Sequence, residues 1–210
     1  MSTPVILSAC RTPIGSFGGA LRDLSAADLG AIVIREAIAR AGINAADIGD
    51  VIMGCVLQAG AGMNVARQAA LMAGVPVEVP AETVNRVCGS GLTAVVHAVE
   101  AVKAGYVDLV LAGGTESMSN APYILKGARW GYRMGHGEAA DSMLAEGLTC
   151  AINGCHMGNT AEEIVNRFNV SREDQDRFSA ESQRRAEHAI NAGVFAKEIV
   201  PVEIPQRKGA

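Results

Sequence analysis

The sequence predicts an α/β protein, because a strand pattern, a sharp turn, an apolar helix and a second strand follow one another between residues 79 and 114. Apolar residues recur at helical spacing from Leu92 to Val102, and Gly105 ends this pattern. The apolar segment 107–112 then reads as the second strand. A strand, a crossover helix and a further strand in this order form the repeating unit of a parallel sheet.

The residues before this unit add two expected strands and two expected helices. Apolar residues 5–9 and 51–53 have the length and composition of short strands. Between them, Ser25 is placed to cap the start of an amphipathic helix, and Gly42 is placed to end it. A compact helix is expected over residues 64–73. This alternation of strands and helices extends the α/β prediction to the whole first half of the sequence.

The composition of the sequence changes after Ser119. Residues 121–148 are rich in Gly, Met, Arg and Tyr and show no regular period, which predicts a long ordered excursion. Excursions of this length are more often functional than incidental. Two helices follow, one ending near Phe168 and one beginning at Ser171, where Asp174 gives the spacing of a capping box.

Composition and charge exclude several classes of protein. The 210 residues include 18 basic and 22 acidic side chains, which give a net charge of −4 without any block of like charge. Neither a nucleic-acid surface nor a membrane surface is therefore indicated. Since there is also no apolar window of about 18 residues and no leader pattern at the start, we expect a cytoplasmic protein.

The five cysteines do not form a disulfide framework, because their number is odd and they are scattered along a long sequence. They are Cys10, Cys55, Cys88, Cys150 and Cys155. Most are expected to be small buried apolar side chains. The spacing Cys150-x4-Cys155-His156 offers three ligands too close together and no fourth, so we expect no metal site.

Cys88 is the strongest candidate for a chemical role. It lies where a strand gives way to a helix, and the positive end of a helix stabilises a thiolate. Gly89 and Gly91 allow a sharp turn and close approach of a substrate, and the N–H of Cys88 is placed to bind an oxyanion. The alternative is a buried structural cysteine. The residues alone leave both interpretations open, because no general base is identifiable.

Several motifs, taken together, resemble the thiolase family, and most closely its biosynthetic branch that forms acetoacetyl-CoA. They are NRVCGSGLTAVVHAVEAV from Asn85, GGTESMSNAPY from Gly113, HMGNTAEE from His156 and the long run from Ser171 to Val202. The resemblance extends from RTPIGSFGG, which begins at Arg11, to the last residue. It implies a thiolase fold of layered helices and a mixed sheet. Residues 1–118 would form the first core domain, and 119–210 part of the cap, or loop, domain.

The resemblance also implies a reaction. Cys88 occupies the position of the cysteine that accepts the acyl group from an acyl-CoA thioester, which then passes to a second acyl-CoA or to free CoA. The expected substrates and products are acetyl-CoA, acetoacetyl-CoA and CoA, in Claisen condensation or thiolytic cleavage, with no cofactor required. Leu148 matches the segment that lines the CoA channel. His156 and Met157 match positions beside the pantetheine arm and the acyl pocket.

Further expectations concern the assembly and what the sequence lacks. The family resemblance implies a role in fatty acid metabolism and a homo-oligomer, a dimer or tetramer, with residues 129–133 in a loop that joins subunits. The family's second half, which carries a GHPxG histidine as base and a CxGG cysteine as acid, is not in these residues. We therefore expect the 210 residues alone to be inactive, with the C-terminal core domain on further residues or a companion chain.

Three alternatives remain at this stage. The first alternative to the catalytic interpretation is a non-catalytic, thiolase-like module that binds CoA or serves in assembly. A thiol-redox or metal protein is a second alternative, although the sequence has no CxxC pair. Within the same superfamily, a ketoacyl synthase is the nearest competitor, but its cysteine context differs and it lacks the HMGxTAE run.

Overall fold

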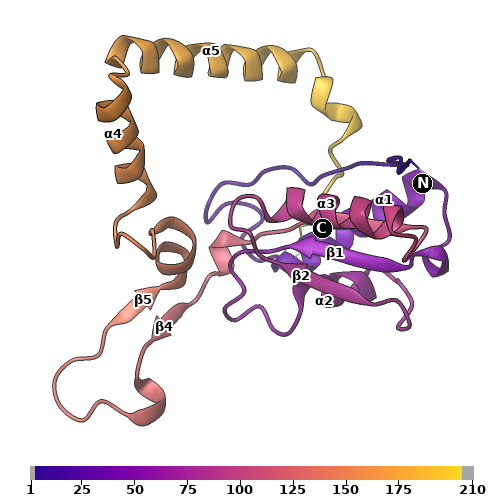
Figure 1. The fold of residues 1–210 in the computed structure, drawn as a ribbon, viewed down its shortest axis with the longest axis horizontal. Coiled ribbons are helices and arrows are strands. Elements are labelled where there is room, and N and C mark those ends of the chain that lie inside the picture. Colours follow the sequence, from indigo (N-terminus) through magenta and orange to yellow (C-terminus); the bar gives the residue numbers. More distant parts are fainter. Residues whose placement is uncertain (1–2, 205–210) are drawn as a thin grey trace.

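A computed structural model describes residues 3–204, which form a layered α/β core and a long arm that leaves the core and returns to it (Figure 1). Six elements build the core. They are α1 (Ala26–Ala41), β1 (Asp50–Gly54), α2 (Val65–Met72), β2 (Ala81–Val84), α3 (Ser90–Lys103) and β3 (Val110–Gly114). The expected α/β architecture is confirmed.

The three core strands form a parallel sheet in the order β2-β1-β3. Val51 and Met53 of β1 point to one face, where they pack with Ile34 of α1 and with α2 in the main apolar cluster. Alternate residues of a strand face opposite sides, so Gly54 faces the other layer, where α3 lies directly against it. Helices α1 and α2 thus cover one side of the sheet, and α3 covers the other.

The expected strand at residues 5–9 is wrong: this segment is extended but joins no ladder in the described part of the chain. Val5 is 76% exposed and Ile6 is 81% exposed. A strand needs a neighbour to receive its backbone hydrogen bonds, and among residues 3–204 no strand pairs with this segment. It is attached to α1 instead, since the Ser8 hydroxyl donates to the carbonyl of Ala37 at 2.7 Å.

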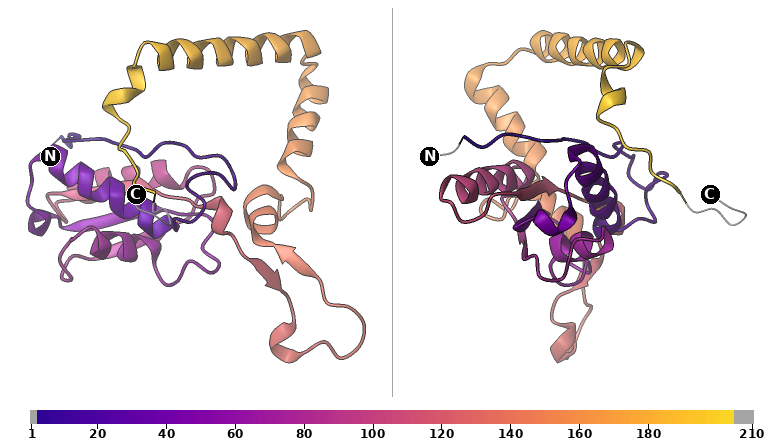
Figure 2. Two further views of the ribbon diagram at one scale, coloured as in Figure 1. Left: turned by 180° about the vertical axis from the view of Figure 1, so that it is seen from behind. Right: turned by 90° about the vertical axis from the view of Figure 1, so that its right-hand side faces the viewer.

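The arm begins after β3 and carries a hairpin, a π-helix and two long helices. In chain order it contains β4 (Tyr123–Leu125), β5 (Ala139–Asp141), the π-helical segment η4 (Met143–Leu148), α4 (Met157–Phe168) and α5 (Arg172–Asn191). Strands β4 and β5 pair antiparallel and project away from the core (Figures 1 and 2). The short 3-10 helices η1 (Ala45–Asp47), η2 (Met118–Asn120), η3 (Ala128–Trp130) and η5 (Val194–Lys197) complete the described chain.

The arm returns to the core through Arg11. The N–H of Arg11 donates to the carbonyl of Glu198, and the N–H of Val200 donates to the carbonyl of Arg11, both at 2.8 Å. The guanidinium of Arg11 also pairs with the carboxylate of Glu198 at 2.7 Å. Residues 198–200 are therefore packed on the first part of the chain, although they follow the arm in sequence.

Between the end of β3 and the return to Arg11, the arm has little apolar packing of its own. Neither α4 nor α5 contains a buried residue, and Trp130 and Met134, between β4 and β5, are 88% and 95% exposed. Across residues 3–204, no helix combines the length and the apolar character needed to cross a membrane.

The contact between Gly54 and α3 gives a stability prediction. A Cβ at Gly54 would lie 2.5 Å from the carbonyl carbon of Ser90 and 2.6 Å from the nitrogen of Gly91. Both are backbone atoms, so Gly54→Ala must displace the helix, and we expect it to lower the free energy of unfolding by about 1–3 kcal/mol. Urea denaturation followed by circular dichroism measures this change.

Gly113→Ala in β3 is the matched control. A Cβ there meets only the flexible end of the Met53 side chain, its sulfur at 3.4 Å and its methyl carbon at 3.7 Å, which are ordinary contacts. We expect its unfolding midpoint to stay close to that of the parent chain. Equal losses in the two variants would show that the close approach of α3 to Gly54 is not what makes alanine unfavourable there.

Candidate active site

Cys88 lies in the turn between β2 and α3, at the carboxyl end of the sheet, and its side chain is exposed. The residue before it, Val87, has a φ of 49°. A β-branched residue in the left-handed region is a true backbone outlier, and such strain persists only where the surrounding structure enforces it. The position of Cys88 is therefore set by a constrained turn.

Hydrogen bonds around the turn supply this constraint. The buried hydroxyl of Ser90 donates to the carbonyl of Val87 at 2.6 Å and accepts the N–H of Arg86 at 2.8 Å. The side-chain oxygen of Asn85 accepts the N–H of Val87 at 2.9 Å. Asn85 and Ser90, which flank the cysteine in the NRVCGS motif, thus hold the strained residue from both sides.

The start of α3 lies close beside Cys88. Gly89 is the N-cap residue, and it makes no side-chain cap hydrogen bond. The first backbone N–H groups of a helix have no partner within the helix, so they carry partial positive charge toward whatever lies at that end. An anionic sulfur or oxygen near Cys88 would be stabilised by these groups.

A cleft of about 370 Å³ opens beside Cys88. Residues from the ends of β1, β2 and β3 form one side of it, and the π-helix η4 of the arm forms the other. Its lining includes Val56, Leu57, Val87, Cys88, Thr115, Glu116, Met118, Met143, Gly147 and Leu148. The structure therefore brings Cys88 and Leu148 to one cleft, although 60 residues separate them in the sequence.

Glu116 is a lining residue that sequence reasoning missed. Its carboxylate accepts the N–H groups of Val56 and Leu57, each at 2.9 Å, and so fixes the loop that follows β1 as a wall of the cleft. The thiol of Cys55 donates to the same carboxylate at 3.5 Å. The available signal was an acidic residue directly after an apolar strand and two glycines, inside the GGTES motif.

Cys55 contrasts with Cys88 in its surroundings. Burial and, to a smaller extent, the neighbouring Glu116 carboxylate, which disfavours a second negative charge, together raise the pKa of the Cys55 thiol to about 12. Cys55 is 1% exposed. It behaves as the inert structural cysteine of the alternative interpretation, whereas Cys88 stands exposed at the cleft.

His156 and Met157 do not line this cleft. His156 caps the start of α4, where its Nδ1 accepts the N–H of Gly158 at 3.0 Å. Met157 begins that helix and is about half exposed. Both residues connect to the cleft through the segment 148–156, because Thr149 and His156 form an antiparallel bridge. The predicted site residues are thus divided between the cleft wall and the adjoining start of α4.

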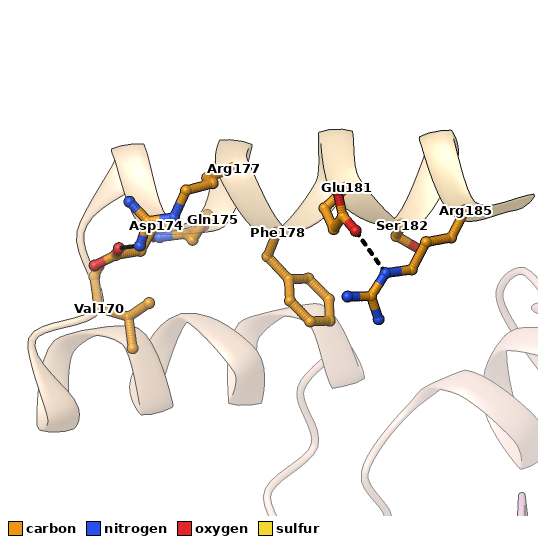
Figure 3. A pocket seen from close by; sticks show the side chains of 8 residues that line it. All are labelled: Val170, Asp174, Gln175, Arg177, Phe178, Glu181, Ser182 and Arg185. Carbon is orange, nitrogen blue, oxygen red and sulfur yellow. Dashed lines mark hydrogen bonds and ion pairs between the residues drawn. The ribbon is translucent and has the colours of Figure 1, made fainter.

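A larger hollow, of about 820 Å³, lies along α5, but its lining differs from that of a catalytic site. Val170 and Phe178 point into the space between α4 and α5, and Arg185 pairs with Glu181 beside it (Figure 3). Arginine donors hold the pKa of the exposed Glu181 carboxyl below its usual value. Its lining contains Ser182 but no cysteine, and no histidine that could activate the serine, so the smaller cleft at Cys88 is the candidate site.

Within residues 3–204, no cluster of three or more His, Cys, Asp or Glu side chains is arranged to hold a metal ion. An exposed cysteine on a strained strand-to-helix turn, beside the N-terminus of a helix, is an arrangement that can support covalent catalysis.

Comparison with known proteins identifies the family. The model of the thiolase N-terminal domain matches residues 4–210, so the chain belongs to the thiolase family. The motif carrying Cys88 and the segment forming η4 both lie within this match. The family resemblance seen in the sequence is confirmed.

Curated relatives agree over the same region. The acetyl-CoA acetyltransferase of Syntrophomonas wolfei is 56% identical over 207 residues, covering 98% of this chain and 52% of the relative. That of Cupriavidus necator is 52% identical over 209 residues, covering 100% of this chain and 53% of the relative. A probable acetyl-CoA acyltransferase of Staphylococcus epidermidis is also 52% identical, with the same coverage. The chain spans about half the length of these relatives.

The environments of the two cysteines give a reactivity prediction. Because the pKa of Cys55 is raised to about 12, almost none of its thiol is ionised at a pH of about 8.5, the ordinary pKa of a free cysteine. We expect iodoacetamide at that pH to modify the exposed Cys88 while Cys55 remains unmodified in the folded chain. Tryptic peptides 41–67 and 87–103 each carry one of the two cysteines, so mass spectrometry reports them separately.

Glu116→Gln refines this test. The substitution removes the negative charge beside Cys55 and leaves its burial unchanged, so the pKa of Cys55 falls only in part and its alkylation becomes faster but still slower than that of Cys88. Alkylation of Cys55 as fast as that of Cys88 in the parent chain would contradict the burial described here.

Proposed function

We propose that the chain is the N-terminal half of an acetyl-CoA C-acetyltransferase in which Cys88 carries the acyl group. The observation that carries the proposal is the turn at Val87, which holds an exposed cysteine beside the N-terminus of α3. The relatives named acetyltransferase support the choice of substrate. Acetyl-CoA, acetoacetyl-CoA and CoA are the proposed substrates and products.

In the proposed first step, the Cys88 thiolate attacks the carbonyl carbon of acetyl-CoA. The new carbon–sulfur bond forms as the bond to the CoA sulfur breaks, and CoA leaves as a thiolate that takes up a proton. One thioester replaces another, so the exchange has little thermodynamic cost. The positive end of α3 stabilises the attacking sulfur and the oxyanion that develops on the carbonyl.

In the proposed second step, the acetyl group leaves Cys88 for the deprotonated α-carbon of a second acetyl-CoA, which gives acetoacetyl-CoA and frees the thiolate. Thiolysis runs the same steps in reverse: the Cys88 thiolate attacks the 3-keto carbon of acetoacetyl-CoA and releases acetyl-CoA after protonation of its α-carbon, and the CoA thiolate then takes the acetyl group from Cys88. Removal of the α-proton requires a general base. We assign that role and the acid role to the GHPxG histidine and CxGG cysteine of the second thiolase half, so the chain acts with that half and is inactive alone.

The remaining site and domain assignments follow from this proposal. Leu148, in the cleft wall, would contact the pantetheine arm of CoA, and His156 with Met157 would lie farther along it, at the start of α4. Residues 1–118 correspond to the first core domain and 119–210 to part of the cap domain. The return of residues 198–200 to Arg11 marks where the cap rejoins the core.

We also propose a cytoplasmic homo-oligomer, a dimer or tetramer, that acts in fatty acid metabolism. Its five cysteines are all free thiols, which suits a reducing compartment. The projecting hairpin exposes Tyr123, Trp130 and Met134, aromatic and sulfur-containing side chains of the kind enriched in protein interfaces. Short acyl-CoA thioesters are intermediates of fatty acid metabolism, which supports this part of the proposal.

Acetylation of Cys88 tests the proposal. The purified protein, supplied with a separately expressed C-terminal half of a thiolase relative, is incubated with acetyl-CoA and digested with trypsin. We expect one acetyl group on peptide 87–103, and none after Cys88→Ser. Cys10→Ser is the matched control, since that half-buried thiol lies outside the cleft and should leave the acetylation unchanged.

The same mixtures report the second step. Formation of acetoacetyl-CoA is expected only when both halves are present, with a loss of at least about a thousandfold in rate for Cys88→Ser, as for other covalent nucleophiles. Tight binding of CoA without any acetylation of peptide 87–103 would instead support a non-catalytic CoA-binding module.

A further inference from the structure

We propose that Cys150 and Cys155 form a reversible intramolecular disulfide, a modification site separate from Cys88. Thr149 and His156 are bridge partners in an antiparallel pairing, which places Cys150 directly opposite Cys155 one step further toward the turn. The N–H of Cys150 donates to the carbonyl of Cys155 at 2.8 Å. The two cysteines are thus the last facing pair before a turn of four residues, 151–154.

The spacing across this pair suits a disulfide. Residues facing each other across antiparallel strands have Cα atoms about 4.5–5.5 Å apart. Disulfides join cysteines whose Cα atoms are roughly 4.4–6.8 Å apart, so the backbone needs no rearrangement to bring these two within range. The pair therefore differs from the other three cysteines, which lie beside separate elements. Cys10 precedes α1, Cys55 follows β1 and Cys88 follows β2.

Both thiols are accessible to a small oxidant. Cys150 and Cys155 are half-buried, and the four turn residues between them are exposed. The N–H of Asn153 donates to the sulfur of Cys150 at 3.5 Å, so this sulfur lies over the turn. By contrast, the thiol of Cys55 is buried, and it donates toward the carboxylate of Glu116.

The oxidant is a low-molecular-weight disulfide of the glutathione type. One cysteine thiolate attacks a sulfur of that disulfide, which forms a mixed disulfide and releases one small thiolate. The facing cysteine thiolate then attacks the protein sulfur of the mixed disulfide and releases the second small thiolate. Two protein thiols are oxidised, one small disulfide is reduced to two thiols, and the two protons lost by the cysteines are taken up by those thiols.

The pair also lies between two parts of the candidate site. Leu148, which lines the Cys88 cleft, is two residues before Cys150, and His156, the N-cap of α4, directly follows Cys155. A covalent bond across the turn ties the cleft wall to the start of α4. Oxidation is therefore expected to reduce the motion of η4. The formation of the disulfide itself does not rest on the proposed acyl transfer.

The experiment uses the full chain, first reduced and then treated with glutathione disulfide. Trypsin leaves both cysteines in one peptide, 134–167, while each remaining cysteine falls alone in another peptide. We expect the mass of peptide 134–167 to fall by two hydrogen atoms and to be restored by dithiothreitol. Persistent free thiols, or two separate glutathione adducts on this peptide, would overturn the proposal.

Two variants and a second measurement complete the test. Cys155→Ser is expected to stop at a glutathione adduct on Cys150, whereas Cys10→Ser should form the disulfide as the parent does. Hydrogen exchange over residues 143–149 should slow when the parent is oxidised and should not slow in oxidised Cys155→Ser. A disulfide that leaves this exchange unchanged would overturn the link between the pair and the cleft wall.

Discussion

The close approach of α3 to the carboxyl ends of β1 and β3 is the constraint on which the site depends. A Cβ at Gly54 would meet the backbone of Ser90 and Gly91, and one at Gly114 would lie 3.1 Å from the Cα of Gly91. With the helix start held this close, the chain leaving β2 has to reverse within a few residues. It does so through the positive φ of Val87, and Cys88 is left exposed at the cleft.

The same packing explains why the cleft has two unlike walls. The strand ends and the loop fixed by Glu116 are rigid parts of the core, whereas η4 belongs to an arm whose long helices bury no residue. The proposed nucleophile on the core side and the proposed CoA-binding wall on the less packed side suit a substrate that combines a small reacting group with a long carrier. The proposed acyl-CoA thioester has this form.

The sequence predicted the parts of this arrangement that local patterns encode. An apolar strand, two glycines and a helical period predict the turn at Cys88. The family resemblance alone led to the prediction that Leu148 lines the CoA channel. The segment 5–9 was predicted wrongly, because an apolar composition specifies a strand only where a neighbouring strand exists. Glu116 escaped notice because its role depends on the N–H groups of Val56 and Leu57, some 60 residues earlier in the sequence, which only the fold brings near.

The most direct test of the central claim is to compare the free energy of unfolding of Val87→Gly, which relieves the strain at this turn, with that of Val110→Gly. Glycine adopts a positive φ freely, and a residue held in a disfavoured region carries about 1–3 kcal/mol of strain. If packing of α3 enforces the turn, Val87→Gly should be at least as stable as the parent, while Val110→Gly, in β3, should be less stable. Equal destabilisation by both substitutions would contradict an enforced turn at Cys88.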